Sequence, residues 1–98
     1  MNNQPKEAFP DYLDNAKVLY FTPKGNYGDL YCDDGTIMAH FTYMAICKYE
    51  KSDVYYLFMC NENFEVETDT LWNSIEQCMG VKHVGDNDEG DVLWIEKS

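Results

Sequence analysis

The stretch YYLFMCNENFEVETDTLWNSIEQCM, residues Tyr55 to Met79, decides the fold. Its start belongs to an unbroken apolar run from Val54 to Cys60, which is too short for an ordinary helix and rich in aromatic residues. Such a run predicts a strand that is covered on both faces. A polar turn follows at 61–63, and residues 64–67 then alternate apolar with acidic side chains at the two-residue period of a strand. The pattern therefore predicts a hairpin at the centre of a sheet.

A helix is expected directly after this hairpin. Thr68-Asp69-Thr70 offers side chains of the kind that cap helix N-termini, and Gly80 is a residue type at which helices end. Between them, Leu71, Ile75 and Cys78 fall on one side of a helix. We expect a helix over about residues 69–79 that packs this apolar side on the sheet.

Upstream, the sequence predicts further strands separated by short polar turns. Residues 17–22 and 27–32 are expected to be strands. Asp34-Gly35 lies between apolar runs and is a strong hairpin signal, because both central positions of a two-residue turn need a positive φ. Residues 36–49 predict one long strand bent near 40–42, or two strands with a bulge between them.

The segments near the two ends are less regular. Residues 1–8 are expected to form a polar N-terminal arm. Pro10 favours one short helical turn, or an irregular arm, over residues 7–15. Three segments follow the predicted helix: a brief strand or coil at 81–84, an acidic loop at 86–91 and a last strand at 92–95.

Because the connections between strands are short, neighbouring strands should run antiparallel. We therefore expect an α+β fold. A single domain over residues 1–98 would hold an antiparallel β-meander sheet of about five to seven strands with one helix on one face.

The charge of the chain indicates its class of partner. Eighteen Asp and Glu against seven Lys and Arg give a formal net charge of −11, which opposes binding to nucleic acid or to an anionic membrane surface. A basic protein is the expected partner. No run approaches the roughly 20 apolar residues of a membrane span, and the first residues do not form a signal peptide, so we expect a cytoplasmic protein.

The residues that could carry chemistry do not form a known catalytic or metal-binding pattern. The four cysteines lie in apolar segments and lack the close spacing of zinc ligands, so we expect small buried side chains. The acidic run at 86–91 departs from a calcium-binding loop at its glycine and at its twelfth position, Lys97. We expect no enzyme activity, no metal and no cofactor.

The acidic surface itself has three possible interpretations: simple solubility, imitation of nucleic acid by carboxylates that stand in for phosphates, and neutralisation of a basic toxin.

The central stretch resembles small bacterial immunity proteins, which are encoded beside secreted or contact-delivered toxins of polymorphic toxin systems. Residues 17–23 (KVLYFTP) also resemble the opening strand of such proteins. The matching residues in the central stretch are Tyr56, Leu57, Phe58, Cys60, Glu62, Asn63, Phe64, Val66, Thr68, Asp69, Thr70, Trp72, Ser74, Ile75 and Glu76. The resemblance implies a cytoplasmic inhibitor that binds one cognate toxin domain, often a nuclease, by occlusion, as a monomer in a 1:1 complex.

If that implication holds, the contact face should draw on acids and tyrosines that lie close together in the hairpins and the acidic loop. The predicted partner-binding residues are Tyr27, Asp29, Tyr31, Asp33, Asp34, Glu65, Glu67, Asp86, Asp88, Glu89 and Asp91.

Overall fold

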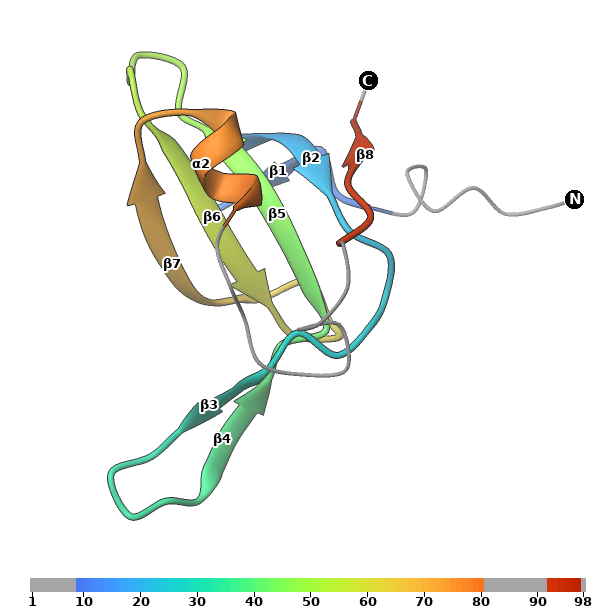
Figure 1. The fold of residues 1–98 in the computed structure, drawn as a ribbon, viewed down its shortest axis with the longest axis vertical. Coiled ribbons are helices and arrows are strands. Elements are labelled where there is room, and N and C mark those ends of the chain that lie inside the picture. Colours follow the sequence, from blue (N-terminus) through green and yellow to red (C-terminus); the bar gives the residue numbers. More distant parts are fainter. Residues whose placement is uncertain (1–8, 81–91, 98) are drawn as a thin grey trace, which may run out of the picture.

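The computed structural model describes residues 9–80 and 92–97. Within these ranges the chain forms a mostly antiparallel sheet with one short helix packed on it (Figure 1), which confirms the α+β fold that the sequence predicts. In chain order, the elements are β1 (Tyr12–Leu13), β2 (Ala16–Phe21), β3 (Asp29–Tyr31), β4 (Ile37–His40), β5 (Tyr43–Lys48), β6 (Tyr55–Cys60), β7 (Val66–Trp72), α2 (Ile75–Met79) and β8 (Ile95–Glu96).

The main sheet follows the order β1-β2-β5-β6-β7, so β5, β6 and β7 form the predicted meander. β3 and β4 pair only with each other, in a two-stranded ribbon inserted between β2 and β5. This ribbon projects from one end of the main sheet (Figure 1). The arrangement separates the described chain into a layered body and one extended hairpin.

Two short strands share one edge of β2. β1 pairs with residues 16–17, whereas β8 pairs with residues 20–21. Lys97 joins the two, because its Nζ donates a hydrogen bond to the Phe9 carbonyl oxygen (2.7 Å) and lies 3.1 Å from a carboxylate oxygen of Asp11. This edge is therefore built from segments at opposite ends of the described chain.

Both faces of the central strands are buried, as predicted for 54–60. One face carries the Phe58 cluster, whose buried members are Phe9, Leu13, Ala16, Val18, Phe21, Ala45, Cys47, Phe58 and Cys60. The opposite face, beneath α2, carries the Leu57 cluster, whose buried members are Tyr27, Phe41, Met44, Ile46, Leu57 and Cys78. Each large side chain buried in this way stabilises the fold by roughly 1.5–3 kcal/mol.

The helix is shorter than the sequence predicts. Residues 69–72, expected as its first turn, belong to β7, where Asp69 lies opposite Phe58 and Trp72 lies opposite Tyr55. Pairing with β6 satisfies the backbone of these residues, and it outweighs their ability to cap a helix. The N-cap is Ser74 instead, whose hydroxyl accepts a hydrogen bond from the Gln77 N–H (3.1 Å).

The segment around Pro10 also differs from its prediction. Instead of a helical turn, β1 and β2 form a tight hairpin in which Leu13 lies opposite Ala16. The two residues between them, Asp14 and Asn15, have positive φ values of 48° and 71°. Asp and Asn tolerate this left-handed conformation better than other non-glycine residues, so they suit a two-residue hairpin loop.

The other boundaries follow the predictions more closely. The 36–49 segment divides into two strands, β4 and β5, as one predicted alternative has it. Phe41 and Thr42 between them are not a bulge in one ladder, because β4 and β5 belong to different sheets. The last strand is Ile95–Glu96 instead of 92–95. The arm at 1–8, the segment at 81–84 and the loop at 86–91 lie outside the described residues. No helix in the described ranges is long and apolar enough to cross a membrane.

Candidate protein-binding surface

The β3–β4 hairpin closes through a three-residue loop. The Cys32 N–H donates to the Thr36 carbonyl (2.8 Å), and the Gly35 N–H donates to the Cys32 carbonyl (3.0 Å). Gly35 has a φ of +91°, whereas Asp34 does not have a positive φ. The expectation that both residues of Asp34-Gly35 adopt positive φ is therefore wrong, because Asp33 is also part of the loop and only the last loop position is left-handed.

Three large apolar side chains on this hairpin are exposed. Tyr31 is 58% exposed, Ile37 48% and Met38 60%. Tyr31 and Ile37 lie directly opposite each other in the ribbon, and Met38 is next to Ile37 in the chain. We call these three residues the hairpin patch. Single exposed hydrophobic residues are ordinary, but neighbouring ones on a projecting element are typical of a contact surface.

Three aspartates lie on the same hairpin as the patch. The hairpin at 28–40 contains Asp29, Asp33 and Asp34 and no Lys or Arg. Asp34 Oδ1 accepts hydrogen bonds from the backbone N–H (3.0 Å) and the hydroxyl (2.7 Å) of Thr36, which lower the pKa of this carboxyl. Asp29 Oδ1 lies 2.6 Å from His40 Nδ1. The hairpin therefore carries exposed apolar side chains together with three aspartates, which we call its negative rim.

Asn61 holds a second group of carboxylates at the β6–β7 turn. Its side-chain nitrogen donates to Glu65 Oε1 (2.8 Å) and to Glu67 Oε2 (2.7 Å). Its side-chain oxygen accepts from the backbone N–H groups of Asn63 (2.8 Å) and Glu65 (3.0 Å). One amide thus holds two carboxylates close together. A cationic partner that binds them would therefore lose less free energy in ordering these side chains.

A groove of about 280 Å³ lies between β4 and this turn. It brings the exposed Met38 of the hairpin patch next to the carboxylates of Glu62 and Glu67. Its lining residues are Met38, Ala39, His40, Thr42, Asn61, Glu62, Asn63 and Glu67. Among the predicted contact residues that the structure describes, Glu67 lines this groove, beside residues of β4 that the sequence did not single out.

The predicted site residues do not all belong to this surface. Tyr27 is buried, at 3% exposed, in the Leu57 cluster, and its hydroxyl donates to the Pro23 carbonyl (2.9 Å), so its prediction as a contact residue is wrong. Asp29, Tyr31, Asp33 and Asp34 lie on the hairpin, Glu65 lies at the β6–β7 turn and Glu67 lies in β7. Asp86, Asp88, Glu89 and Asp91 lie outside the described residues.

Three of the four cysteines are buried, and their burial disfavours the thiolate form. Cys47, Cys60 and Cys78 are buried free thiols, whereas Cys32 is partly exposed, contrary to the expectation that all four are buried. Loss of water around them raises the pKa of Cys60 to about 12 and that of Cys78 to about 11, and it raises the pKa of Cys47 as well. These three thiols stay protonated at neutral pH. Within residues 9–80 and 92–97, no His, Cys, Asp and Glu side chains gather in a group that could hold a metal ion.

Comparison with protein-family models finds no matching family, and comparisons with curated proteins and with solved structures find no match.

Proposed function

We propose that this chain is a cytoplasmic inhibitor of the immunity-protein kind, which binds a cognate basic toxin domain 1:1 and covers its active cleft. The observation that carries the proposal is the hairpin patch: Tyr31, Ile37 and Met38 are exposed on a projecting hairpin with a negative rim. The resemblance to immunity proteins adds the class of partner, a nuclease-like toxin.

The two kinds of residue on this surface would play separate roles. Carboxylates attract a basic partner over a distance and speed its encounter, with an effect that salt screens. Aromatic and long apolar side chains supply the short-range energy that keeps a complex together, because they exclude water when they are covered. A hairpin that stands away from the body can enter a cleft, which is the shape that occlusion requires.

The test is binding to the toxin domain encoded by the neighbouring gene, measured by calorimetry together with inhibition of the toxin's activity. Replacing Tyr31 and Met38 together by Ala should weaken the complex by about a hundredfold or more, since each is expected to act as a central anchor. Leu71→Ala is the matched control, because Leu71 is 54% exposed on β7, away from the hairpin. Equal affinity of the double variant and the control would contradict the proposal.

The acidic residues of the hairpin and of the groove have a test of their own. Asp33→Asn and Glu62→Gln should slow association and reduce its dependence on salt while changing dissociation less. Asp53→Asn, an exposed acid in the turn between β5 and β6, provides the same change of charge elsewhere. If all three variants behave alike, the acidic surface serves solubility and does not steer the partner.

The fixed carboxylates at Asn61 favour one alternative function, imitation of nucleic acid. Charges held at set positions, as Glu65 and Glu67 are, could stand in for phosphates in the groove of a nucleic-acid-binding protein. An inhibitor of that kind would displace DNA from several unrelated basic proteins. An immunity protein would bind its one toxin domain and leave the others free.

A further inference from the structure

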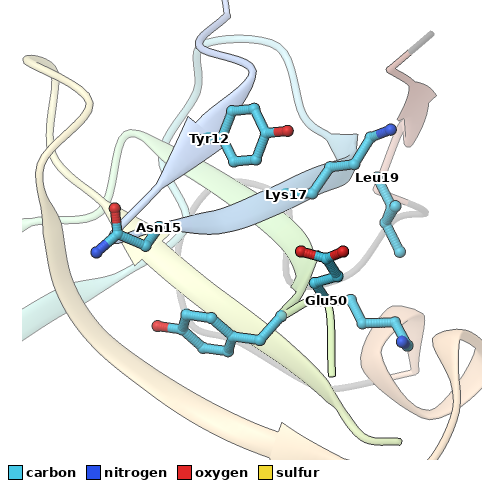
Figure 2. A pocket seen from close by; sticks show the side chains of 7 residues that line it. Tyr12, Asn15, Lys17, Leu19 and Glu50 are labelled. Atoms are coloured by element: carbon cyan, nitrogen blue, oxygen red, sulfur yellow. The ribbon is translucent and has the colours of Figure 1, made fainter. Parts of the chain in front are cut away.

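A pocket of about 390 Å³ lies on the part of the sheet formed by β1, β2 and the end of β5. The hairpin leaves the sheet at its other end, where β5 begins (Figure 1). The polar and aromatic residues of the pocket lining are Tyr12, Asn15, Lys17, Lys48, Tyr49 and Glu50. Figure 2 shows Tyr12 next to Lys17 on the neighbouring strand, with Glu50 on the other side of Lys17. None of these residues belongs to the surface proposed above.

Two lysines occupy directly opposed positions in this pocket. Lys17 of β2 is the cross-strand partner of Lys48 in β5, and Tyr12 of β1 is the partner of Lys17 on its other side. The three side chains therefore form one row across three adjacent strands. Like charges directly opposite each other in a sheet destabilise it. A chain with only seven Lys and Arg among 98 residues nevertheless places two of them here.

The surrounding acids do not neutralise this pair. In the described ranges, the ion pairs are those of His40 with Asp29 and of Lys97 with Asp11, and neither Lys17 nor Lys48 takes part in one. Glu50 lines the same pocket, and it is not among the residues of these two ion pairs. The two ammonium groups are thus left to water or to a ligand.

We propose that this pocket binds the phosphoryl group of a small molecule. The two ammonium groups supply several hydrogen-bond donors and a charge of about +2, which a phosphate dianion matches in both respects. A carboxylate has one charge and two oxygens, so it would leave some of these hydrogen-bond donors without an acceptor. The rings of Tyr12 and Tyr49 offer apolar surface to the group that carries the phosphate, and the volume admits more than a bare ion.

The experiment is a titration of the whole chain with inorganic phosphate and, separately, with adenosine monophosphate, at fixed ionic strength set by sodium chloride. Binding is followed by calorimetry and by the rise in Tm that a ligand of the folded state produces. Both probes should bind the wild type. Tighter binding of the nucleotide would identify a phosphate ester as the ligand, and equal binding would identify phosphate itself.

Variants of the lysines and of Glu50 should act in opposite directions. Lys17→Gln and Lys48→Gln should each weaken binding about tenfold, since each removes a charge-assisted contact. Glu50→Gln should strengthen it, because it removes a negative charge from the pocket. Lys51→Gln is the matched control: it makes the same change of charge at an exposed lysine that does not line the pocket.

Folding can be checked without the ligand. Removing one of two opposed lysines relieves repulsion, so Lys17→Gln and Lys48→Gln should unfold at a temperature no lower than that of the wild type. Binding that is absent in the wild type, or equal in all four variants, would overturn the proposal. Because none of these residues belongs to the hairpin surface, this outcome is independent of inhibition of a toxin.

Discussion

The β3–β4 and β6–β7 hairpins close with the same type of turn, but one turn projects and the other packs against the body of the protein. In each, the residue before a three-residue loop donates its N–H to the carbonyl after the loop and accepts a hydrogen bond from the third loop residue. That third residue has a positive φ in both hairpins, +91° at Gly35 and +64° at Phe64. The same backbone conformation is therefore adopted by a glycine in one hairpin and by a phenylalanine in the other.

The difference lies in what each turn contacts. Glycine adopts a positive φ without strain, whereas the same conformation costs a residue such as Phe64 about 1–2 kcal/mol. The Phe64 ring offsets this cost by stacking on Tyr43 (centroids 4.7 Å apart) and meeting Phe9 edge-on (5.2 Å). A Cβ built on Gly35 would meet nothing within 4 Å. The strained turn is fixed to the Phe58 cluster, and the relaxed one projects.

The largest expected contrast is in thiol accessibility. Cys32 begins the projecting turn and is partly exposed, whereas Cys60, at the end of β6, is fully buried. With an alkylating reagent at pH 8, Cys32 should react faster than Cys60 by a factor on the order of 1,000 or more, because Cys60 reacts only after the sheet opens. Peptide mapping by mass spectrometry of the wild type measures both rates. Similar rates would mean that the two hairpins are equally mobile.

The next effect in size is that of Phe64→Ala. It removes the stacking on Tyr43 and the edge-on contact with Phe9 but keeps a non-glycine residue at positive φ, so it should lower the free energy of unfolding by about 2–3 kcal/mol. Phe64→Gly loses the same ring but relieves the strain, so it should be less harmful by about 1 kcal/mol. Urea unfolding compares the two. A glycine variant less stable than the alanine variant would contradict this account of the turn.

Gly35→Ala tests the projecting turn in the same way. The new methyl group has open space around it, so its only cost is the positive φ, about 1 kcal/mol in the free energy of unfolding. Urea unfolding measures this loss. Gly25→Ala serves as a contrast, because its Cβ would lie only 3.0 Å from the Tyr27 hydroxyl oxygen and 3.1 Å from the nearest ring carbons. A loss at Gly35 well above 1 kcal/mol would indicate contacts that the open turn does not have.

The smallest expected effect comes from Asp34→Asn. Hydrogen bonds from Thr36 lower the pKa of the Asp34 carboxyl below its ordinary 3.8, so its ionised form contributes stability above pH 3.8 and loses that contribution as pH falls through the lowered pKa. The urea midpoint of Asp34→Asn should therefore lie slightly below that of the wild type at pH 7 and approach it in strong acid. Thr36→Val, which deletes one donor, should reduce the same difference. A gap that stays constant down to acid pH would exclude this cause.

Much of the sheet could be predicted because the hydrophobic pattern of each strand agrees with the way the strand is buried in the fold. The apolar run at 54–60 is covered on both faces, as its composition indicates. The start of the helix could not be located in the same way, because Thr68-Asp69-Thr70 suits both a cap and a strand and only the pairing with β6 decides between them. Asp14-Asn15 was a readable hairpin signal, since both residues tolerate a positive φ.

The candidate surface was partly predictable for a similar reason. Acids such as Asp33 and Asp34 belong at exposed turns whatever the rest of the fold does. Whether an aromatic residue is buried depends on distant partners, so Tyr27 and Tyr31 look alike in sequence and end at 3% and 58% exposure. The role of Asn61 depends on hydrogen bonds across its own turn, which composition does not reveal.

The shared edge of β2 affects the order in which the sheet can be completed. Phe9 and Lys97, which meet there, are separated by 88 positions along the chain. During synthesis, β2, β5, β6 and β7 can associate while half of that edge still lacks the strand that covers it. Unpaired backbone groups at an exposed edge attract other chains. Until residues 95–97 are added, the part of β2 that they cover should therefore make the nascent protein prone to aggregation, and deleting them should leave that hazard in place.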